Sequence, residues 1–262
     1  MLPHKLSLSP AEKMARALDP ILIARDAGIK NLHAEQIRIL KNWRMDAMLC
    51  WGRQLGKTEV LSIRLAHDLL TNVSAVAIVA ARAGRQSYEC FKRTRQLLKK
   101  IPYCPEFLID NVDEIELVGG NRLLAFPGSS SDTIRGVAGV TLAALDEATL
   151  MERDTRDSIS PMCAVRGAPI ICAGTAQGES GWFWEQWQDQ SINDFTLKSR
   201  LTVDQVSHIS RDFIEREKKR MPSYEFRREY MAEFLEDGES QLIDRATVMR
   251  AICPDPEVRA LW

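Results

Sequence analysis

The stretch that decides the fold is residues 46–58, which read Asp-Ala-Met-Leu-Cys-Trp-Gly-Arg-Gln-Leu-Gly-Lys-Thr. Its first six residues are a short, mainly apolar run with the length of a buried strand, and Gly52 ends that run in a tight turn. Apolar residues then recur at helical spacing over residues 57–70, so the turn leads directly into a helix. A strand, a glycine-containing turn and a helix in this order predict a loop that binds phosphate.

The residue types in this loop match what a chain of phosphates requires. Backbone N–H groups point into a concavity, and the N-terminus of the following helix favours negative charge. Lys57 is predicted to reach the β- and γ-phosphate oxygens of ATP, and Thr58 to ligate Mg²⁺. Trp51 stands where the common pattern has its first glycine. The nucleotide-binding residues that we predict here are Gly52, Arg53, Gln54, Leu55, Gly56, Lys57 and Thr58.

A second apolar run, residues 140–145, ends in the adjacent carboxylates of Asp146 and Glu147. We expect the strand beside the phosphate loop of a P-loop ATPase to end this way, because ligands bind at the carboxyl edge of a parallel sheet. Asp146 is predicted to hold the metal ion, and Glu147 to act as the general base that activates the attacking water. Without the loop, such a pair is more often a solvated turn.

The remaining pattern is that of an α/β protein. Apolar runs at 75–81 and 169–173 alternate with helical stretches, and a hairpin is predicted around residues 119–121. This predicts a RecA-like (ASCE) P-loop NTPase fold, with a mainly parallel central sheet flanked by helices. From Leu201 the sequence becomes charged and helical, at 203–221 and 224–234. We therefore divide the chain into a core, residues 1–200, and a small C-terminal helical lid, residues 201–262.

Composition narrows the class without deciding it. The 262 residues are 45% hydrophobic, and 35 Lys and Arg face 36 Asp and Glu, so net charge gives no sign of nucleic-acid binding. Apolar runs are too short for a membrane span, and the N-terminus lacks the apolar core of a secretion signal. The six cysteines include no Cys-x-x-Cys pair, which favours buried free thiols in a reducing cytosol.

These motifs together resemble the ATPase domain of the large terminase subunit, the DNA-packaging motor of tailed bacteriophages. The Arg-Gln-x-Gly-Lys-Thr form of residues 53–58 is similar to that family's phosphate loop, and residues 34–37 are similar to its adenine-contacting segment. Residues 80–86 and Arg135-Gly136 resemble two further elements. Gly174-Thr175 resembles the coupling motif, although Ala176 stands where Pro is common, and residues 226–234 resemble the lid segment.

The resemblance and the loop chemistry assign roles to four further residues. Gln36 is expected to contact the adenine base, and Thr175 to couple hydrolysis to movement. Arg53 is expected to stabilise the transition state in cis, and Arg135 to do so in trans from a neighbouring subunit. The alternatives are an exposed helix residue for Gln36, a surface position for Arg53, and an Arg135 that braces its own loop.

The function that the resemblance implies is a Mg²⁺-dependent ATPase that drives viral double-stranded DNA into a procapsid. It implies the portal protein and the small terminase subunit as partners, and a ring on the procapsid formed from chains that are monomeric or weakly associated alone. The implied location is the cytoplasm of the infected bacterial host, with no membrane. Only 22 residues follow Ser240, too few for the nuclease domain with which the family normally continues, so we expect no nuclease activity from this chain.

Two other functions are less consistent with the sequence. A helicase-type translocase would need a second RecA-like domain. A non-catalytic, nucleotide-responsive scaffold is disfavoured because Lys57, Asp146 and Glu147 are all present. Residues 82–100 carry seven Lys and Arg against Glu89 alone, which indicates either a surface that grips DNA phosphates or an ordinary solvated face. The aromatic residues at 182–187 are expected to pack in the core rather than stack on DNA bases.

Overall fold

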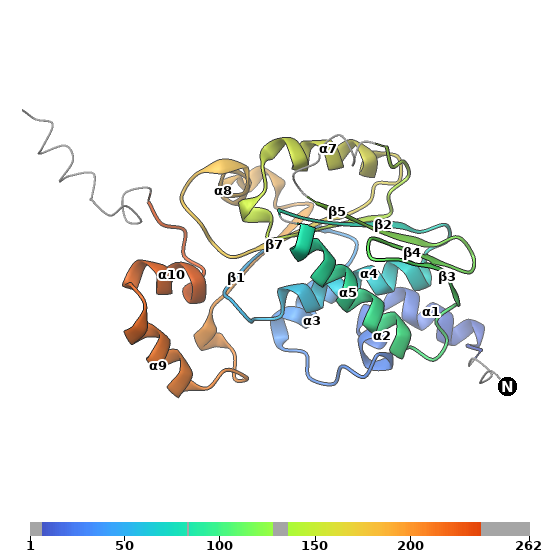
Figure 1. Cartoon of the computed structure of the whole chain (residues 1–262), viewed down its shortest axis with the longest axis horizontal. Coiled ribbons are helices and arrows are strands. Elements are labelled where there is room, and N and C mark those ends of the chain that lie inside the picture. The colour runs from blue at the N-terminus through green and yellow to red at the C-terminus, as the bar shows by residue number, and fades with distance from the viewer. Residues whose placement is uncertain (1–6, 83, 128–135, 237–262) are drawn as a thin grey trace, which may run out of the picture.

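The computed structural model describes residues 7–82, 84–127 and 136–236. Within these ranges the chain forms an eight-stranded sheet between two layers of helices (Figure 1). The strand order is β3-β4-β5-β2-β6-β7-β1-β8, with β3 and β4 antiparallel and the other strands parallel. The strands are β1 (Asp46–Trp51), β2 (Val76–Ala81), β3 (Phe107–Asp110), β4 (Glu114–Leu117), β5 (Arg122–Pro127), β6 (Leu142–Asp146), β7 (Ile170–Gly174) and β8 (Thr196–Leu201).

In the described part of the chain, five helices cover one face of the sheet, two cover the other, and two form a lobe at its side (Figure 1). The first face carries α1 (Pro10–Leu18), α2 (Pro20–Asp26), α3 (Ala34–Lys41), α4 (Lys57–Thr71) and α5 (Gly84–Lys100). The second carries α7 (Arg153–Ala164) and α8 (Gly181–Gln188), and the lobe is formed by α9 (Arg211–Arg220) and α10 (Ser223–Met231). Short 3-10 turns occupy η1 (Ala148–Leu150), η2 (Gln190–Ile192) and η3 (Val203–Gln205).

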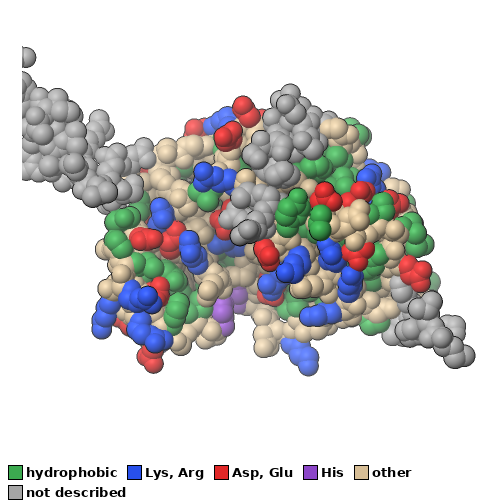
Figure 2. Space-filling model, viewed as in Figure 1, with side chains coloured by type: hydrophobic (Ala, Val, Ile, Leu, Met, Phe, Trp, Pro, Cys, Tyr) green, Lys and Arg blue, Asp and Glu red, His purple; other side chains and the backbone are tan. Residues whose placement is uncertain are grey.

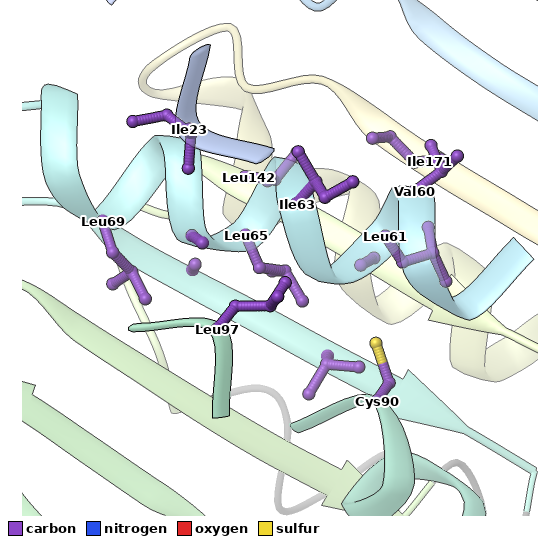
Figure 3. Close-up of a cluster of buried hydrophobic side chains, with 14 of the residues drawn as sticks. Ile23, Val60, Leu61, Ile63, Leu65, Leu69, Cys90, Leu97, Leu142 and Ile171 are labelled. Atoms are coloured by element: carbon purple, nitrogen blue, oxygen red, sulfur yellow. The ribbon is translucent and has the colours of Figure 1, made fainter. Parts of the chain in front are cut away.

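Alternation along the strands divides the core into two halves. In β1, Leu49 and Trp51 join the cluster beneath α4, whereas Met48 and Cys50 join the cluster beneath α7 and α8. Helix α4 is buried from residue 60 to residue 69, and its apolar side chains meet those of α2, α5 and the sheet (Figure 3). Each fully buried aliphatic side chain stabilises the fold by about 1.5–3 kcal/mol, so this helix is firmly fixed.

The predicted α/β class, the strand–loop–helix unit and the hairpin are confirmed. Three details differ from the prediction. Strand β7 lies between β1 and β6, so the strand that carries Asp146 is not the immediate neighbour of the loop strand. Strand β8 forms the sheet edge beside β1, in a stretch for which no strand was predicted, and it reaches the boundary that we drew at residue 200. The long helix over 203–221 is shorter, because Ser210 caps a helix that begins at Arg211.

Two expectations about chemistry and environment are also met. The five cysteines within the described ranges are buried free thiols, and Cys253 lies outside those ranges. No helix in the described part of the chain is both long and apolar enough to cross a bilayer. The aromatic residues of α8 pack as expected, with Trp182 and Phe183 buried and their neighbours in contact with Phe234.

Candidate active site

The loop between β1 and α4 depends on backbone conformations that favour glycine. Gly56 begins α4 with a φ of +85°, and a Cβ at this position would overlap the side-chain nitrogen of Gln36. Gln54 also has a positive φ, 59°, which costs free energy for a residue with a side chain. Gly52 lies against the end of α10, since a Cβ there would be 2.7 Å from the carbonyl oxygen of Tyr230. The loop is therefore closely fitted to α3 on one side and α10 on the other.

Lys57 fills the interior of this loop. Its ammonium group donates to the carbonyl oxygens of Trp51 at 2.8 Å and Gly52 at 3.0 Å, and to Oγ1 of Thr175 at 3.1 Å. Burial lowers the pKa of Lys57, while the nearby charges of Glu147 and Asp146 oppose that shift. The predicted coupling residue Thr175, at the end of β7, is thus in direct contact with the phosphate-loop lysine.

Thr58 and Asp146 meet across the sheet although β7 separates their strands. Thr58 Oγ1 donates to Asp146 Oδ2 at 3.1 Å, and the other carboxylate oxygen accepts from the Glu147 N–H at 3.1 Å. Burial, followed by the charge of Glu147, raises the pKa of Asp146 to about 6. Among the described residues no three His, Cys, Asp or Glu side chains cluster to hold a metal. This arrangement fits Mg²⁺, which commonly takes few protein ligands and completes its shell with phosphate and water.

Glu147 is the predicted base, and its backbone is in the left-handed region with φ of 55°. Such strain at a residue with a side chain costs on the order of 1–3 kcal/mol and is found most often at functional sites. The side chain is half-buried and lines a cavity of about 590 Å³ together with the phosphate loop, Gln36 and Glu59. The predicted loop, metal ligands and base therefore share one cavity.

Gln36 lies in the wall of this cavity and is 2% exposed, so the alternative of an exposed helix residue is wrong. Its side-chain oxygen accepts from the His33 N–H at 3.0 Å, and its side-chain nitrogen donates to Glu59 at 3.0 Å. These bonds fix the amide beside Gly56. Contact with adenine stays a prediction.

Arg53 forms a contact that sequence reasoning missed. Its backbone N–H donates to the carbonyl oxygen of Glu229 at 2.7 Å, and its guanidinium pairs with the carboxylate of the same residue in α10. Burial lowers the pKa of Arg53, but the Glu229 carboxylate more than offsets this and the net shift is upward. Glu229 is 6% exposed, which shows that it faces the protein interior although it lies in a charged helix. A buried glutamate in the segment resembling the lid was the available signal.

Two histidines at the cavity were also missed. His33 Nε2 lies 3.0 Å from the carbonyl oxygen of Leu55, and His208 Nε2 lies 3.1 Å from that of Gln54. The two rings are stacked with centroids 6.4 Å apart. Purple histidine side chains are visible where the surface is hollowed between the α9–α10 lobe and the main body (Figure 2). They bracket the phosphate loop from its outer side.

The segment after β7 is tied to the segment after α10. The Glu179 N–H donates to the carbonyl oxygen of Leu235 at 2.9 Å, and the Leu235 N–H donates to that of Gln177 at 3.1 Å. Arg135, the predicted trans-acting residue, lies outside the described residues.

The basic segment of residues 82–100 is partly neutralised by acidic neighbours. Arg93 pairs with Glu59 at 2.6 Å, while Arg95 and Lys99 both pair with Asp110, at 3.2 and 2.6 Å. On the face shown in Figure 2, acidic and basic side chains are interspersed. DNA contact through this segment stays a prediction.

A phosphate loop that enters a buried helix, a carboxylate pair at the end of a neighbouring strand and a mainly parallel sheet together define a P-loop NTPase. A family model described as "Terminase large subunit, T4likevirus-type, N-terminal" matches residues 48–247, and the chain belongs to this family.

Curated relatives and solved structures agree with this assignment. The large terminase subunits of Thermus phage G20c and Thermus virus P23-45 are each 24% identical over 242 residues, covering 79% of this chain and 50% of theirs. The chain thus spans about half the length of these relatives. The fold is similar to the large terminase ATPase domain of Thermus phage P74-26, with a TM-score of 0.72, 21% identity and coverage of 83% of this chain and 100% of that one. It is also similar to the large terminase of another thermophilic bacteriophage, solved in complex with ADP, with a TM-score of 0.68, 18% identity and coverage of 78% and 54%.

Proposed function

We propose that this chain binds ATP with Mg²⁺ and hydrolyses it, and that the hydrolysis drives double-stranded viral DNA into a procapsid. The observation that carries the hydrolytic part is the meeting of Lys57, Thr58, Asp146 and Glu147 at one cavity. Family membership supports the motor function, and the similar large terminase from a thermophilic bacteriophage has been solved in complex with ADP and with ATP-γ-S.

Each proposed role follows from the chemistry of the side chain. Lys57 would exchange its bonds to loop carbonyls for phosphate oxygens, and Thr58 and Asp146 would hold Mg²⁺, which neutralises phosphate charge when bound. Glu147 would accept the proton of the attacking water. Arg53 would stabilise developing negative charge after leaving Glu229, and Thr175 would sense the position of Lys57.

The wider assignments rest on the family alone. We propose a core of residues 1–200 and a lid of residues 201–262, self-association into a ring on the procapsid, and the portal protein and small terminase subunit as partners in the host cytoplasm. Arg135 is proposed to act in trans within that ring. Mixing Arg135→Ala chains with Glu147→Gln chains would then restore activity that neither shows alone, whereas no recovery under conditions of proven assembly contradicts it.

A single-turnover assay tests the hydrolytic proposal on the chain itself. With excess protein and Mg²⁺, we expect radiolabelled ATP to be converted to ADP, and chelation of the metal to stop conversion. Binding without conversion would instead support a nucleotide-responsive scaffold. The motor function is tested separately, by protection of DNA from nuclease in a packaging reaction with procapsids.

A further inference from the structure

A second cavity lies at the edge of the sheet opposite the phosphate loop. It has a volume of about 490 Å³ and is lined where the chain approaches the amino ends of parallel strands β1, β2, β6 and β7. The C-terminal half of α4 forms its inner wall through Arg64, His67 and Asp68. Ligands of open parallel sheets bind at the other, carboxyl edge, so nothing in the nucleotide site accounts for this cavity.

Arg64 is the unusual residue here. It is 2% exposed, and among the described residues its Nε and Nη1 atoms are buried with no hydrogen-bond partner. Burial lowers the pKa of Arg64 to about 9, which still leaves the guanidinium charged at neutral pH. A buried charge without a partner is costly, and proteins compensate such groups with an ion pair, a hydrogen-bonded ligand or both.

Neighbouring groups compensate Arg64 only in part. The indole ring of Trp43 lies under two guanidinium groups, with the Cζ atoms of Arg44 and Arg64 at 4.7 and 5.8 Å from its centroid. Asp68 is the acidic residue in the wall, but its two carboxylate oxygens accept from Thr141 at 2.6 Å and from Asn72 at 2.5 Å. It therefore serves other donors.

Two exposed arginines line the same cavity. Arg44 precedes β1, and Arg166 precedes β7 and donates weakly to the carbonyl oxygen of Val73 at 3.5 Å. Three guanidinium groups thus face one carboxylate, since the pKa of His67 is lowered to about 4 by burial and by the Arg64 charge. The remaining charge of about two matches a phosphate dianion better than a single carboxylate, and guanidinium groups bind phosphate through paired N–H donors.

We propose that this cavity binds a phosphate group, with Arg64 at its inner end and Arg44 and Arg166 at its mouth. The source is either free phosphate or the backbone of a nucleic acid, which present the same oxygens. The proposal is independent of nucleotide binding at the phosphate loop.

The test reads the indole N–H signals of Trp43 and Trp51 in one ¹⁵N-labelled chain. Trp43 lies in the arginine cavity and Trp51 at the phosphate loop, so one titration with inorganic phosphate reports the two sites separately. Substitution of each tryptophan by Phe assigns the signals. We expect a saturable shift of the Trp43 signal that is weakened at least tenfold in Arg64→Met, with the Trp51 response unchanged. Arg211→Met, at the exposed start of α9, is the matched control.

Arg166→Ala, at an exposed position, gives the same test if Arg64→Met does not fold. A short DNA duplex is then titrated. If it shifts the Trp43 signal and inorganic phosphate competes, the source is a nucleic-acid backbone. If phosphate alone shifts it, the source is the free ion. A Trp43 signal that neither probe moves, or that moves equally in wild type, Arg64→Met and Arg166→Ala, would overturn the proposal.

Discussion

Arg53 in the phosphate loop binds Glu229 in α10 twice, through its backbone N–H at 2.7 Å and through its guanidinium. The backbone bond holds α10 against the loop whatever the side chain does. The side-chain pair is the variable part, because the Arg53 side chain is 65% exposed and an ion pair with such access to water contributes little to stability.

Substitutions in this pair therefore separate catalysis from packing. We expect Arg53→Ala to lower the rate of ATP hydrolysis about 10³-fold, as the loss of a transition-state arginine does. Glu229→Gln should lower the rate less than tenfold, because the backbone bond remains. Single-turnover rates measure this, with unfolding free energies alongside. Equal losses of rate in both variants would mean that Arg53 acts only through its pairing with Glu229.

Glu147→Gln should retain ATP binding and lose turnover by 10²–10⁴-fold, the usual contribution of a positioned general base. The amide keeps the size and hydrogen-bonding capacity of the side chain but cannot accept the water's proton. Glu152→Gln makes the same charge change at an exposed helix N-terminus whose side chain makes no capping bond, and it should leave the rate unchanged. Wild-type turnover in Glu147→Gln would refute the assignment of the base.

The two left-handed residues of the loop should respond oppositely to substitution. Gly56→Ala strains the backbone and overlaps Gln36, so we expect the free energy of unfolding to fall by about 2 kcal/mol or more, with loss of ATP binding. Gln54→Gly removes an existing strain at φ of 59° and should leave stability unchanged or raise it by up to about 1 kcal/mol. Urea unfolding compares them. A Gly56→Ala chain as stable as wild type would contradict the loop geometry.

Stability should depend on pH through His67. Its Nε2 lies 3.1 Å from the carbonyl oxygen of Arg16, and burial lowers its pKa from 6.5 to about 4. Between these values the unfolded chain binds the proton and the folded chain does not, so this residue costs stability as pH falls from about 6.5 towards 4. The full shift corresponds to on the order of 3 kcal/mol.

The measurement is the difference in unfolding free energy between wild type and His67→Gln at pH 7 and at pH 4.5. The glutamine amide can still donate to the same carbonyl oxygen but does not titrate. The difference should change in favour of the variant at low pH. The comparison is necessary because the raised pKa of Asp146 acts in the opposite direction in wild type. A difference that is the same at both pH values would show that His67 titrates normally.

The parts of the site that the sequence predicts are local in the chain. Residues 46–58 specify a strand, a turn and a helix by neighbouring residue types, and a buried strand followed by Asp146 and Glu147 is equally local. Partners that come together only in the fold left no such pattern, as with Arg53 and Glu229, which are 176 positions apart.

Strand order and edge strands were beyond the same reasoning. The position of β7 between β1 and β6 is set by contacts among distant segments. Strand β8 pairs with β1 on one side only, and its Lys198 and Arg200 interrupt the apolar pattern on which strand prediction depends. A half-buried edge strand needs fewer apolar residues than a central one, so its sequence resembles that of a loop.

Thr175 touches Lys57, the chain just after it is bonded through Gln177 and Glu179 to Leu235, and Leu235 follows directly from α10, which returns to the loop through Arg53. These contacts form a closed linkage, in the engineer's sense that every member constrains the next around a circuit. In such a linkage a rotation imposed at any joint must be taken up by all the others. A change in how Lys57 is held would therefore reach α10 by two routes at once, and tilting α10 would in turn reset the phosphate loop.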